Sequence, residues 1–399
     1  MAAQHRQHQG GHYQGMAGQQ QEARVGFTVQ VSYMLAAIRD DIPENWDNWR
    51  HGQLPPPLMY PTATFKDEDV GRVFATNYIG ALITQAVAAY SQDPQAAGGG
   101  GWRIDVADDE RVSPPERLRC SIPAGNRWLM VRLTSPVMWA DNTANFRYLR
   151  HVFGSLAEAL DLQTPEGCGM TVSVGVAPRA FSLPELRKLA AGFLVTEPLL
   201  ATLPCRTPEF VSNTTEIQGE KLDESYGHVK DAPEITHNSN PPLHSQLFNY
   251  HRVIYRDALQ RRQPPPTLPL RTTFDRLMAA SSPEEVRSLV VSSLPDPPAY
   301  DLSETVFACK QLPATTDADS VAVWCALVTG LARLFLAESE QGHQTLLNIC
   351  EFAQENPGHF DVFDVLQTTN LSSIAESIQR RMIEKANLLP WANPPSRGL

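Results

Sequence analysis

The chain has 399 residues, a formal net charge of −11 at pH 7 and 32 prolines, and 42% of its residues are hydrophobic. This length fits about two to three domains, or one large α/β or α+β domain, with enough apolar residues for a sizeable core. The acidic balance argues against binding to nucleic acid or to an anionic membrane, because the long-range field of the protein repels phosphate.

The sequence gives no signal for export or membrane insertion. Residues 1–22 are rich in Gln, Gly and His and lack the apolar segment of a signal peptide, so we expect them to be disordered. We find no apolar run of the roughly 18–20 residues that a membrane helix needs. Six scattered cysteines without a CxxC pair predict free thiols in a reducing compartment and no zinc site. We therefore expect a cytoplasmic protein.

The first half of the chain predicts alternating strands and helices. Residues 25–33 alternate apolar and polar side chains, which is the period of a strand with one buried face. The same period recurs at 128–136 and 170–176, and 102–106 is a further short candidate. Apolar residues at helical spacing predict helices over 67–90 and 142–160. A third helix begins at a capping box formed by Ser182 and Glu185 and runs to about residue 203.

The second half of the chain is less regular. Residues 207–270 are polar and rich in proline, and we expect a long excursion there with one helix near 245–261. A short helix at 283–291 and a short strand at 305–310 follow. Residues 319–338 form a strongly apolar predicted helix, and polar helices at 343–354, 361–367 and 371–386 close the chain.

These elements predict an α+β fold, a curved and largely antiparallel sheet flanked by helices. The strands are irregularly spaced and no glycine-rich phosphate loop follows a strand, which argues against a doubly wound parallel sheet. We expect a disordered tail at 1–22, one main domain at 23–340 that includes the excursion at 207–270, and C-terminal helices and tail at 341–399 packed on the same domain.

Several segments in the same order resemble motifs of the fungal amidoligase family over about residues 24–337. They are VGFTVQV at 25–31, RLTSPVM at 132–138, CGMTVSVG at 168–175, FSL with LRKL at 181–189, and TVFACKQ at 305–311 followed by VAVW at 321–324. The family comprises ATP-dependent carboxylate–amine ligases with a fold similar to glutamine synthetase and glutamate–cysteine ligase. The resemblance implies an amidoligase-like sheet whose polar face carries the ligand site.

The ionisable residues of that family site are replaced in this chain. The positions that face Mg-ATP in the family are occupied here by Thr28, Gln30, Arg132, Thr171, Ser173, Phe307 and Cys309. Mg²⁺ prefers carboxylate oxygens, and phosphoryl transfer relies on charge neutralisation, whereas a cation such as Arg132 would repel the metal. We therefore expect no intact catalytic set, no metal site and no cofactor. The residual candidates for ligand binding are Arg132, Glu197 and Arg206.

Three functions remain open from the sequence, and whether the chain is an enzyme is undecided. The leading hypothesis is a pseudoenzyme that binds a small carboxylate, a nucleotide or a protein partner, with Arg132 holding the anion. The second is an active ligase that forms an amide or peptide bond, with ATP and Mg²⁺ held by relocated carboxylates such as Asp105, Asp108 or Glu197. The third is an accessory protein of a fungal biosynthetic pathway, such as one of secondary metabolism, without chemistry of its own.

Overall fold

The structure is a computed structural model of the chain. It describes residues 24–39, 58–60, 68–90, 101–107, 127–164, 168–200, 270–293, 300–303, 305–355, 362–369 and 371–387.

Strands and helices follow one another irregularly along the described chain. The strands are β1 (Arg24–Arg39), β2 (Leu58–Tyr60), β3 (Arg103–Ala107), β4 (Arg127–Thr134), β5 (Met138–Trp139), β6 (Leu162–Gln163), β7 (Gly169–Ala177), β8 (Tyr300–Leu302) and β9 (Phe307–Pro313). The helices are α2 (Glu68–Tyr90), α4 (Thr143–Ala159), α5 (Leu183–Leu200), α8 (Leu270–Ala279), α9 (Pro283–Ser293), α10 (Ala318–Ala337), α11 (Glu340–Glu355), α12 (Val362–Thr368) and α13 (Ser372–Asn387).

Strand β1 is the centre of the sheet and pairs along both of its edges. On one edge it pairs antiparallel with β4 over residues 30–37 and with β5 at 26–27. On the other edge it pairs antiparallel with β7 over 24–31 and with β6 at 34–35, and then parallel with β2 at 37–39. Most of this 16-residue strand therefore has backbone partners on both sides, as buried backbone groups require.

Ser135 connects the two strands that share one edge of β1. Its backbone N–H donates to the carbonyl oxygen of Val29 at 2.9 Å, and its hydroxyl accepts a hydrogen bond from the Val29 N–H at 2.9 Å. The same hydroxyl donates to the carbonyl oxygen of Pro136 at 3.0 Å. The serine hydroxyl therefore takes the place of a backbone carbonyl as the acceptor for the Val29 N–H, where the chain passes from β4 to β5.

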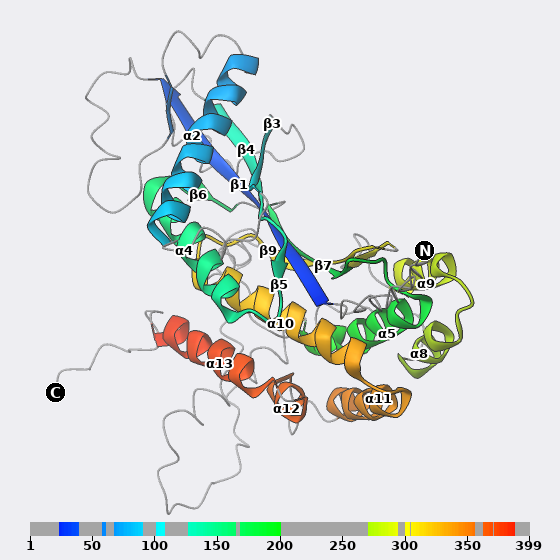
Figure 1. The fold of residues 1–399 in the computed structure, drawn as a ribbon. Coiled ribbons are helices and arrows are strands. Elements are labelled where there is room, and N and C mark those ends of the chain that lie inside the picture. Colours follow the sequence, from blue (N-terminus) through cyan, green and yellow to red (C-terminus); the bar gives the residue numbers. More distant parts are fainter. Residues whose placement is uncertain are drawn as a thin grey trace, which may run out of the picture.

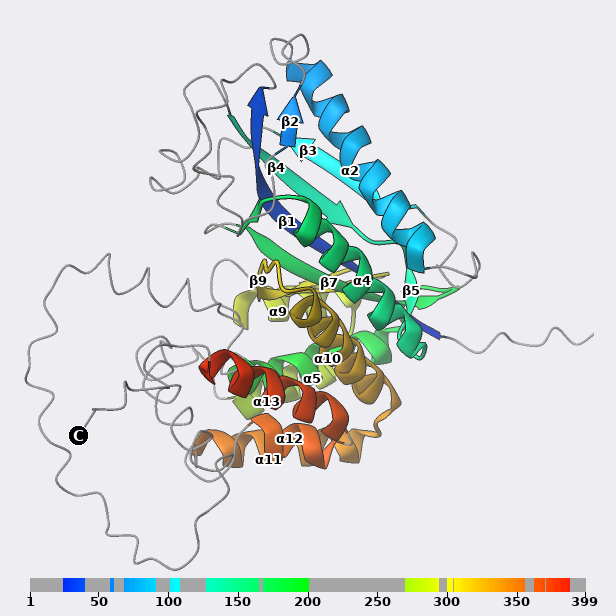
Figure 2. The ribbon, with the colours of Figure 1, turned by 90° about the vertical axis from the view of Figure 1, so that its left-hand side faces the viewer.

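The described strands form one sheet in the order β3-β4-β1-β7-β9-β8, with β2, β5 and β6 attached to β1. All neighbours in that order are antiparallel. The fold is therefore α+β with a largely antiparallel sheet, as expected from the spacing of the predicted elements. Figure 2 shows the sheet twisting along this order.

The described helices gather on one face of the sheet (Figures 1 and 2). Helix α2 packs against α4 and β3, and α4 packs against α10, which in turn contacts β1 and β7. Helix α5 continues this layer through contacts with α10, α8 and α9. Helix α11 packs against α5 and α8, while α13 contacts both α12 and α10. The C-terminal helices therefore rest on the helix layer rather than on the sheet.

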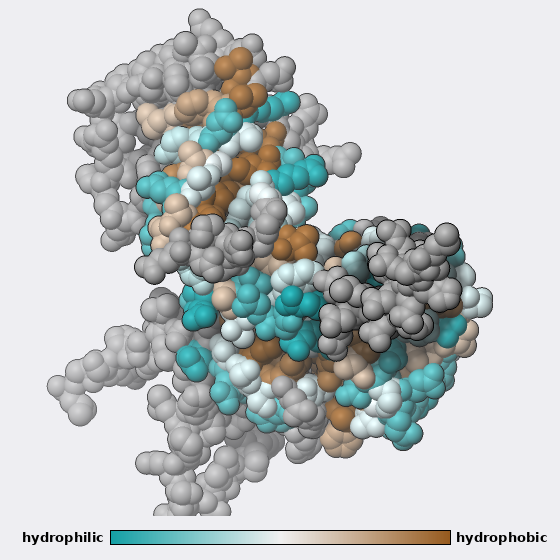
Figure 3. Space-filling model, viewed as in Figure 1, coloured by the Kyte–Doolittle hydropathy of each residue, from teal (hydrophilic) through white to brown (hydrophobic). Residues whose placement is uncertain are grey.

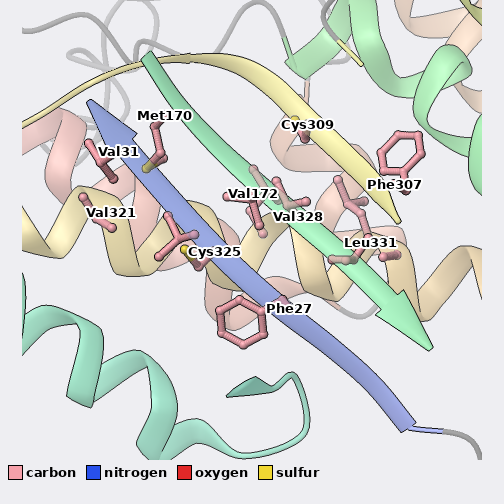
Figure 4. Packing of buried hydrophobic residues seen from close by; sticks show 14 of the residues in the cluster. Phe27, Val31, Met170, Val172, Phe307, Cys309, Val321, Cys325, Val328 and Leu331 are labelled. Carbon is pink, nitrogen blue, oxygen red and sulfur yellow. The ribbon is translucent and has the colours of Figure 1, made fainter. Parts of the chain in front are cut away.

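The hydrophobic core lies between the sheet and this helix layer (Figure 4). Every second residue of β1 and β7 points into it, so that Phe27 and Val172 are almost completely buried. Helix α10 supplies the facing surface, including the buried residues Val321, Cys325, Val328 and Leu331. The apolar character of α10 is thus explained by its position under the central strands.

One buried hydrogen bond ties the central strand to the start of α10. The Tyr33 hydroxyl donates to the carbonyl oxygen of Thr315 at 2.9 Å, across 282 positions of sequence. Burial raises the pKa of Tyr33, so its hydroxyl remains protonated and available as a donor. Two residues later Asp317 caps α10, accepting a hydrogen bond from the Asp319 N–H at 3.1 Å.

The long predicted elements agree with the structure, and the short ones differ. Strand β1 continues beyond residue 33 to Arg39, and the strand expected at 305–310 begins at Phe307 and ends at Pro313. The sequence pattern did not predict β2, β5, β6, β8 or α8. The tail at 1–22 and the helix expected near 245–261 lie outside the described residues.

Two helices have the length and apolar composition of a membrane-spanning helix, which corrects the expectation that no segment would. They are α10, with a mean hydropathy of 1.8, and the Val70–Tyr90 part of α2, with a mean hydropathy of 1.2. More than half of the most apolar 18-residue stretch of α10 is buried in the protein, whereas only 22% of the corresponding stretch of α2 is buried. Burial in the core accounts for the apolar composition of α10, whereas α2 is largely exposed.

Gly192 on α5 has no room for a side chain, because a Cβ there would overlap the ring of Phe335 on α10. That ring is also held edge-on against Phe193, with 5.1 Å between ring centroids. We expect Gly192→Ala to lower the free energy of unfolding by about 1–3 kcal/mol through overpacking, although alanine favours helix. Urea denaturation measures this change. Gly101→Ala is the control, since a Cβ there meets no atom within 4 Å, and an equal loss in both variants would contradict the packing argument.

Candidate functional site

Polar side chains line the face of the sheet that the described helices leave uncovered. Thr28, Gln30 and Ser32 alternate along β1 with its core residues and are partly exposed. Thr171 and Ser173 do the same on β7. The register pairs Thr28 with Ser173 and Gln30 with Thr171, so these four side chains form two adjacent cross-strand pairs. We call this surface the polar face; it consists of Thr28, Gln30, Ser32, Arg132, Thr134, Thr171 and Ser173.

Strands β4 and β3 add the charged groups at the side of the polar face. Arg132 on β4 pairs with Ser32 of β1 and with Asp105 of β3, and its side chain is exposed. The Asp105 carboxylate is already bound by Arg103, with 3.1 Å between Nε and Oδ2. With respect to the described residues, Arg132 itself makes no hydrogen bond or ion pair. It is therefore an exposed cation between the hydroxyl-bearing Ser32 and the ion pair of Asp105 with Arg103.

Phe307 and Cys309 do not lie on the polar face, which corrects the expectation drawn from the resemblance. Phe307 pairs with Val174 and Cys309 pairs with Val172, and all four side chains are buried on the helix-covered side. The Phe307 ring stacks on Phe193 of α5, with 4.4 Å between ring centroids. Figure 4 shows Phe307 and Cys309 among the core residues. Neither side chain can contact a ligand on the polar face.

Ala308 and Lys310 are the β9 residues that belong to the uncovered side. Ala308 pairs with Ser173, which fixes the face, and the alternation of a strand places Lys310 on the same side. Lys310 is exposed. The sequence holds a signal for this arrangement, because Phe and Cys at alternate positions mark the buried side and Lys marks the exposed one.

Glu197 lies on a different side of the sheet from Arg132, and the expectation for Arg206 falls outside the described residues. Helix α5, which carries Glu197, packs on the helix-covered side, because its residue Phe193 stacks on Phe307. The sheet therefore lies between Glu197 and Arg132. Arg206 and Asp108 fall outside the described residues. Of the relocated carboxylates considered from the sequence, Asp105 is the one that the structure places beside the polar face.

The polar face suits hydrogen bonding and anion binding better than metal coordination. Its hydroxyl and amide groups both donate and accept hydrogen bonds, and Arg132 supplies a positive charge. Mg²⁺ sites are built mainly from carboxylate oxygens and phosphates, whereas these side chains offer neutral oxygens. No group of three or more His, Cys, Asp or Glu residues is arranged to hold a metal ion in the part of the chain that the structure describes.

The described cysteines are core residues rather than reactive groups. Cys168, Cys309, Cys325 and Cys350 are all buried and are not in disulfides. Burial raises the pKa of Cys168 and of Cys350 to about 12, so both remain protonated at neutral pH. A thiol in this state is a weak nucleophile, which leaves these side chains a packing role.

Asp161 is a buried carboxyl group that the sequence analysis did not single out. It follows α4, and its side chain is only 2% exposed. One carboxyl oxygen accepts a hydrogen bond from Nε2 of Gln163 at 2.5 Å, and Oδ2 has no partner among the described residues. Burial raises the pKa of Asp161. A single carboxyl group without a second functional side chain is not a site by itself, but it affects stability.

Comparison with known proteins gave no match to a family model, to a curated protein or to a solved structure. The residues of the polar face and their chemistry are therefore the basis for proposing a function.

A new carboxylate should destabilise the protein strongly on the core side of the sheet and only slightly on the polar face. We expect Phe307→Glu to cost about 3–5 kcal/mol of folding free energy or to prevent folding, because it buries an unpaired charge beside Phe193. Thr171→Glu, on the polar face, should change stability by less than about 1 kcal/mol. Thermal unfolding followed by circular dichroism measures both, and Phe307→Leu shows how much of the loss is packing alone. If Phe307→Glu were as stable as Thr171→Glu, the facing of β9 would be wrong.

The raised pKa of Asp161 makes a prediction for the pH dependence of stability. Because the folded pKa lies above the unfolded value near 4, ionisation costs folding free energy, and stability should fall as pH rises from about 4 through the folded pKa. We expect Asp161→Asn to remove this decline. Urea denaturation at several pH values between 4 and 8 tests it, and parallel profiles for the variant and the natural protein would contradict the burial of a titrating carboxyl group.

Proposed function

We propose that this protein is an amidoligase-like binding protein whose catalytic site has degenerated, and that its polar face holds a small anion at Arg132. The order of the sequence motifs that resemble the amidoligases supports the relationship. An α+β fold with an antiparallel sheet and a polar face that the described helices leave uncovered is compatible with it. The proposed ligand class is a small carboxylate or a nucleotide phosphate.

The exposed guanidinium of Arg132 is the observation that carries the proposal. Its cross-strand neighbour on β1 is Ser32, and its neighbour on β3 is Asp105, whose carboxylate is bound by Arg103. A guanidinium group binds a carboxylate or a phosphate through two parallel hydrogen bonds. The neighbouring hydroxyl and amide side chains can bind the remaining polar atoms of such a ligand.

The same set of residues argues against ligase chemistry that depends on magnesium. A ligase of this kind neutralises the charge of transferring phosphoryl groups with metal ions held by carboxylates. Thr28, Gln30, Thr171 and Ser173 cannot supply that charge, and Arg132 would repel the ions. We therefore propose a role in binding, or as an accessory protein in a biosynthetic pathway, ahead of an active ATP-dependent ligase.

Isothermal titration calorimetry tests the proposal with ATP, inorganic pyrophosphate and L-glutamate as probes, each with and without MgCl₂. We expect at least one anion to bind without magnesium, and Arg132→Ala to weaken that binding at least tenfold. Arg147→Ala is the matched control, because Arg147 is an exposed arginine on α4, on the helix-covered side. It should leave the affinity unchanged.

Three outcomes would count against this function. ATP binding that requires MgCl₂ would favour the active ligase with relocated carboxylates, and Asp105→Asn would then be the next variant to test. Equal losses in Arg132→Ala and Arg147→Ala would remove Arg132 from the site. No binding of any probe by a folded protein would remove the small-anion role and leave that of an accessory protein.

A further inference from the structure

Two buried polar groups without partners lie on one row of the sheet. One is Oδ2 of Asp161, the buried carboxyl group described above, and the other is the indole N–H of Trp128 on β4. Each atom is shielded from solvent and has no hydrogen-bond partner among the described residues. Buried polar groups are almost always hydrogen-bonded, because burial takes away their hydrogen bonds to water. An unpaired donor and an unpaired acceptor on the same row therefore point to a molecule that binds both.

The pairing of β1 brings these two groups into one row. Ala36 of β1 pairs with Trp128. On the other edge Leu35 pairs with Leu162, and this antiparallel register, continued by one residue, sets Asp161 opposite Ala36. Figure 1 shows β4 and β6 on opposite edges of β1. Adjacent strands are about 4.8 Å apart, so the Cα atoms of Trp128 and Asp161 are about 10 Å apart.

Both side chains are on the same side of the sheet as the polar face. Ala36 follows Ser32 and Met34 at every second position of β1, and strand alternation gives these three residues a common side. Residues opposite one another on neighbouring strands share that side, which therefore holds Trp128 and Asp161 as well. Because the residue between them is alanine, no long side chain of β1 separates the indole from the carboxyl group.

The next row along β1 surrounds these groups with thioethers and one amide. It consists of Met130, Met34 and Gln163. Both methionines are buried, and Gln163 donates a hydrogen bond to Oδ1 of Asp161 at 2.5 Å. We call the two rows together the Asp161 cluster; it consists of Trp128, Ala36, Asp161, Met130, Met34 and Gln163. Trp128 is partly exposed, so the cluster reaches solvent at its β4 end. Figure 3 shows how apolar and polar residues are distributed over one side of the molecule.

The two unpaired groups define the ligand that satisfies both. A carboxylate in apolar surroundings is best stabilised by a cation that donates a hydrogen bond, because a buried charge needs a partner of opposite sign. Gln163 offers Asp161 only a neutral donor, and burial raises the pKa of Asp161. The indole N–H can only donate, so it needs an acceptor atom. A molecule with a protonated amine and an oxygen atom a few bonds apart supplies both.

A metal ion or an anion fits the Asp161 cluster less well. A hard metal ion needs several oxygen ligands, whereas the indole of Trp128 presents an N–H. An anion would be repelled by the carboxylate of Asp161. The net charge of −11 attracts small cations to the protein. The indole ring and the thioethers of Met34 and Met130 provide apolar contacts for the carbon chain of an amine, and an aromatic ring also attracts its ammonium group.

We propose that the Asp161 cluster binds a small amino alcohol, whose ammonium group donates to Oδ2 of Asp161 and whose oxygen accepts from the indole N–H of Trp128. This site is distinct from the anion site on the polar face. Arg132 lies four residues from Trp128 on the same strand, which is about 13 Å along β4. The inference therefore does not depend on the proposed function.

Nuclear magnetic resonance tests the site, with ethanolamine as the probe. The proton–nitrogen correlation spectrum has one indole signal for each of the seven tryptophans, and the signal of Trp128 is the one missing from Trp128→Phe. A ligand of this size binds with a dissociation constant on the order of 1 mM. We expect ethanolamine, added to the full chain at pH 7 and constant ionic strength, to shift the Trp128 signal downfield and to saturate. Ethylamine, which lacks the oxygen, and ethylene glycol, which lacks the charge, should bind at least fivefold more weakly.

Variants of the two polar groups test their separate roles. Asp161→Asn keeps the shape of the side chain and should weaken ethanolamine binding at least tenfold, because the charge is lost. Asp275→Asn is the matched control, since Asp275 is exposed on α8, and it should leave the affinity unchanged. Trp128→Phe keeps an aromatic ring and removes the donor, so calorimetric titration should show weaker binding than in the control Trp324→Phe on α10. Circular dichroism checks that each variant is folded.

Four results would overturn the proposal. The first is a Trp128 signal that ethanolamine does not move in the folded protein. The second is binding of ethylamine or ethylene glycol as tight as that of ethanolamine. The third is an equal affinity of Asp161→Asn and Asp275→Asn. The fourth is a crystal structure, grown with ethanolamine, in which an ordered water alone bridges Trp128 and Asp161, because the two groups would then hold a structural water.

Discussion

The need to pair the backbone of β1 on both edges shapes the rest of this protein. A buried strand of this length cannot leave its N–H and C=O groups without partners, because each would cost free energy comparable to a lost hydrogen bond. No single neighbour spans all of β1, so β5 continues the edge of β4, and β6 and β2 continue the edge of β7. Ser135 closes one junction with its hydroxyl. The division of the sheet into a core side and a polar side follows from the alternation of the same strand.

The sequence predicted those elements that are long enough to show a regular spacing of apolar residues, every second residue in a strand or every three to four residues in a helix. Strands β1, β4 and β7 show it over many residues, as do α2, α4 and α10. The strands β2, β5, β6 and β8 have two or three residues each and owe their existence to the open edge of a neighbour, which one sequence does not reveal. The facing of β9 was predicted wrongly because motif resemblance was preferred to alternation, although Phe307, Cys309 and Lys310 contained the answer.

The candidate site illustrates which part of a binding surface sequence can predict. Thr28, Gln30, Thr171 and Ser173 lie together, as the motif resemblance implied; alternation predicts the side that each faces, but not the pairing of β1 with β7. The pairing of Arg132 with Asp105 depends on the register between β3 and β4, and the separation of Glu197 from Arg132 depends on which side α5 covers. Both features depend on the tertiary structure, which the sequence pattern alone does not specify. They change the proposed chemistry, since they separate Glu197 from Arg132 and leave Arg132 beside a carboxylate, Asp105, that Arg103 already binds.

The hydrogen bond between Tyr33 and Thr315 also has a consequence for how the chain reaches its fold. Apart from the short β2, the neighbours of this strand near the N-terminus come from residues 127–177, and its tie to α10 comes only from residue 315. During synthesis β1 therefore emerges long before any of these partners exist, with an apolar side and two unpaired edges. Contacts of such sequence separation are slow to form, because the loop entropy must be spent before they stabilise anything. The central position of β1 thus leaves an apolar strand without most of its partners until a large part of the chain has been made, which is the state in which unpaired strand edges favour aggregation.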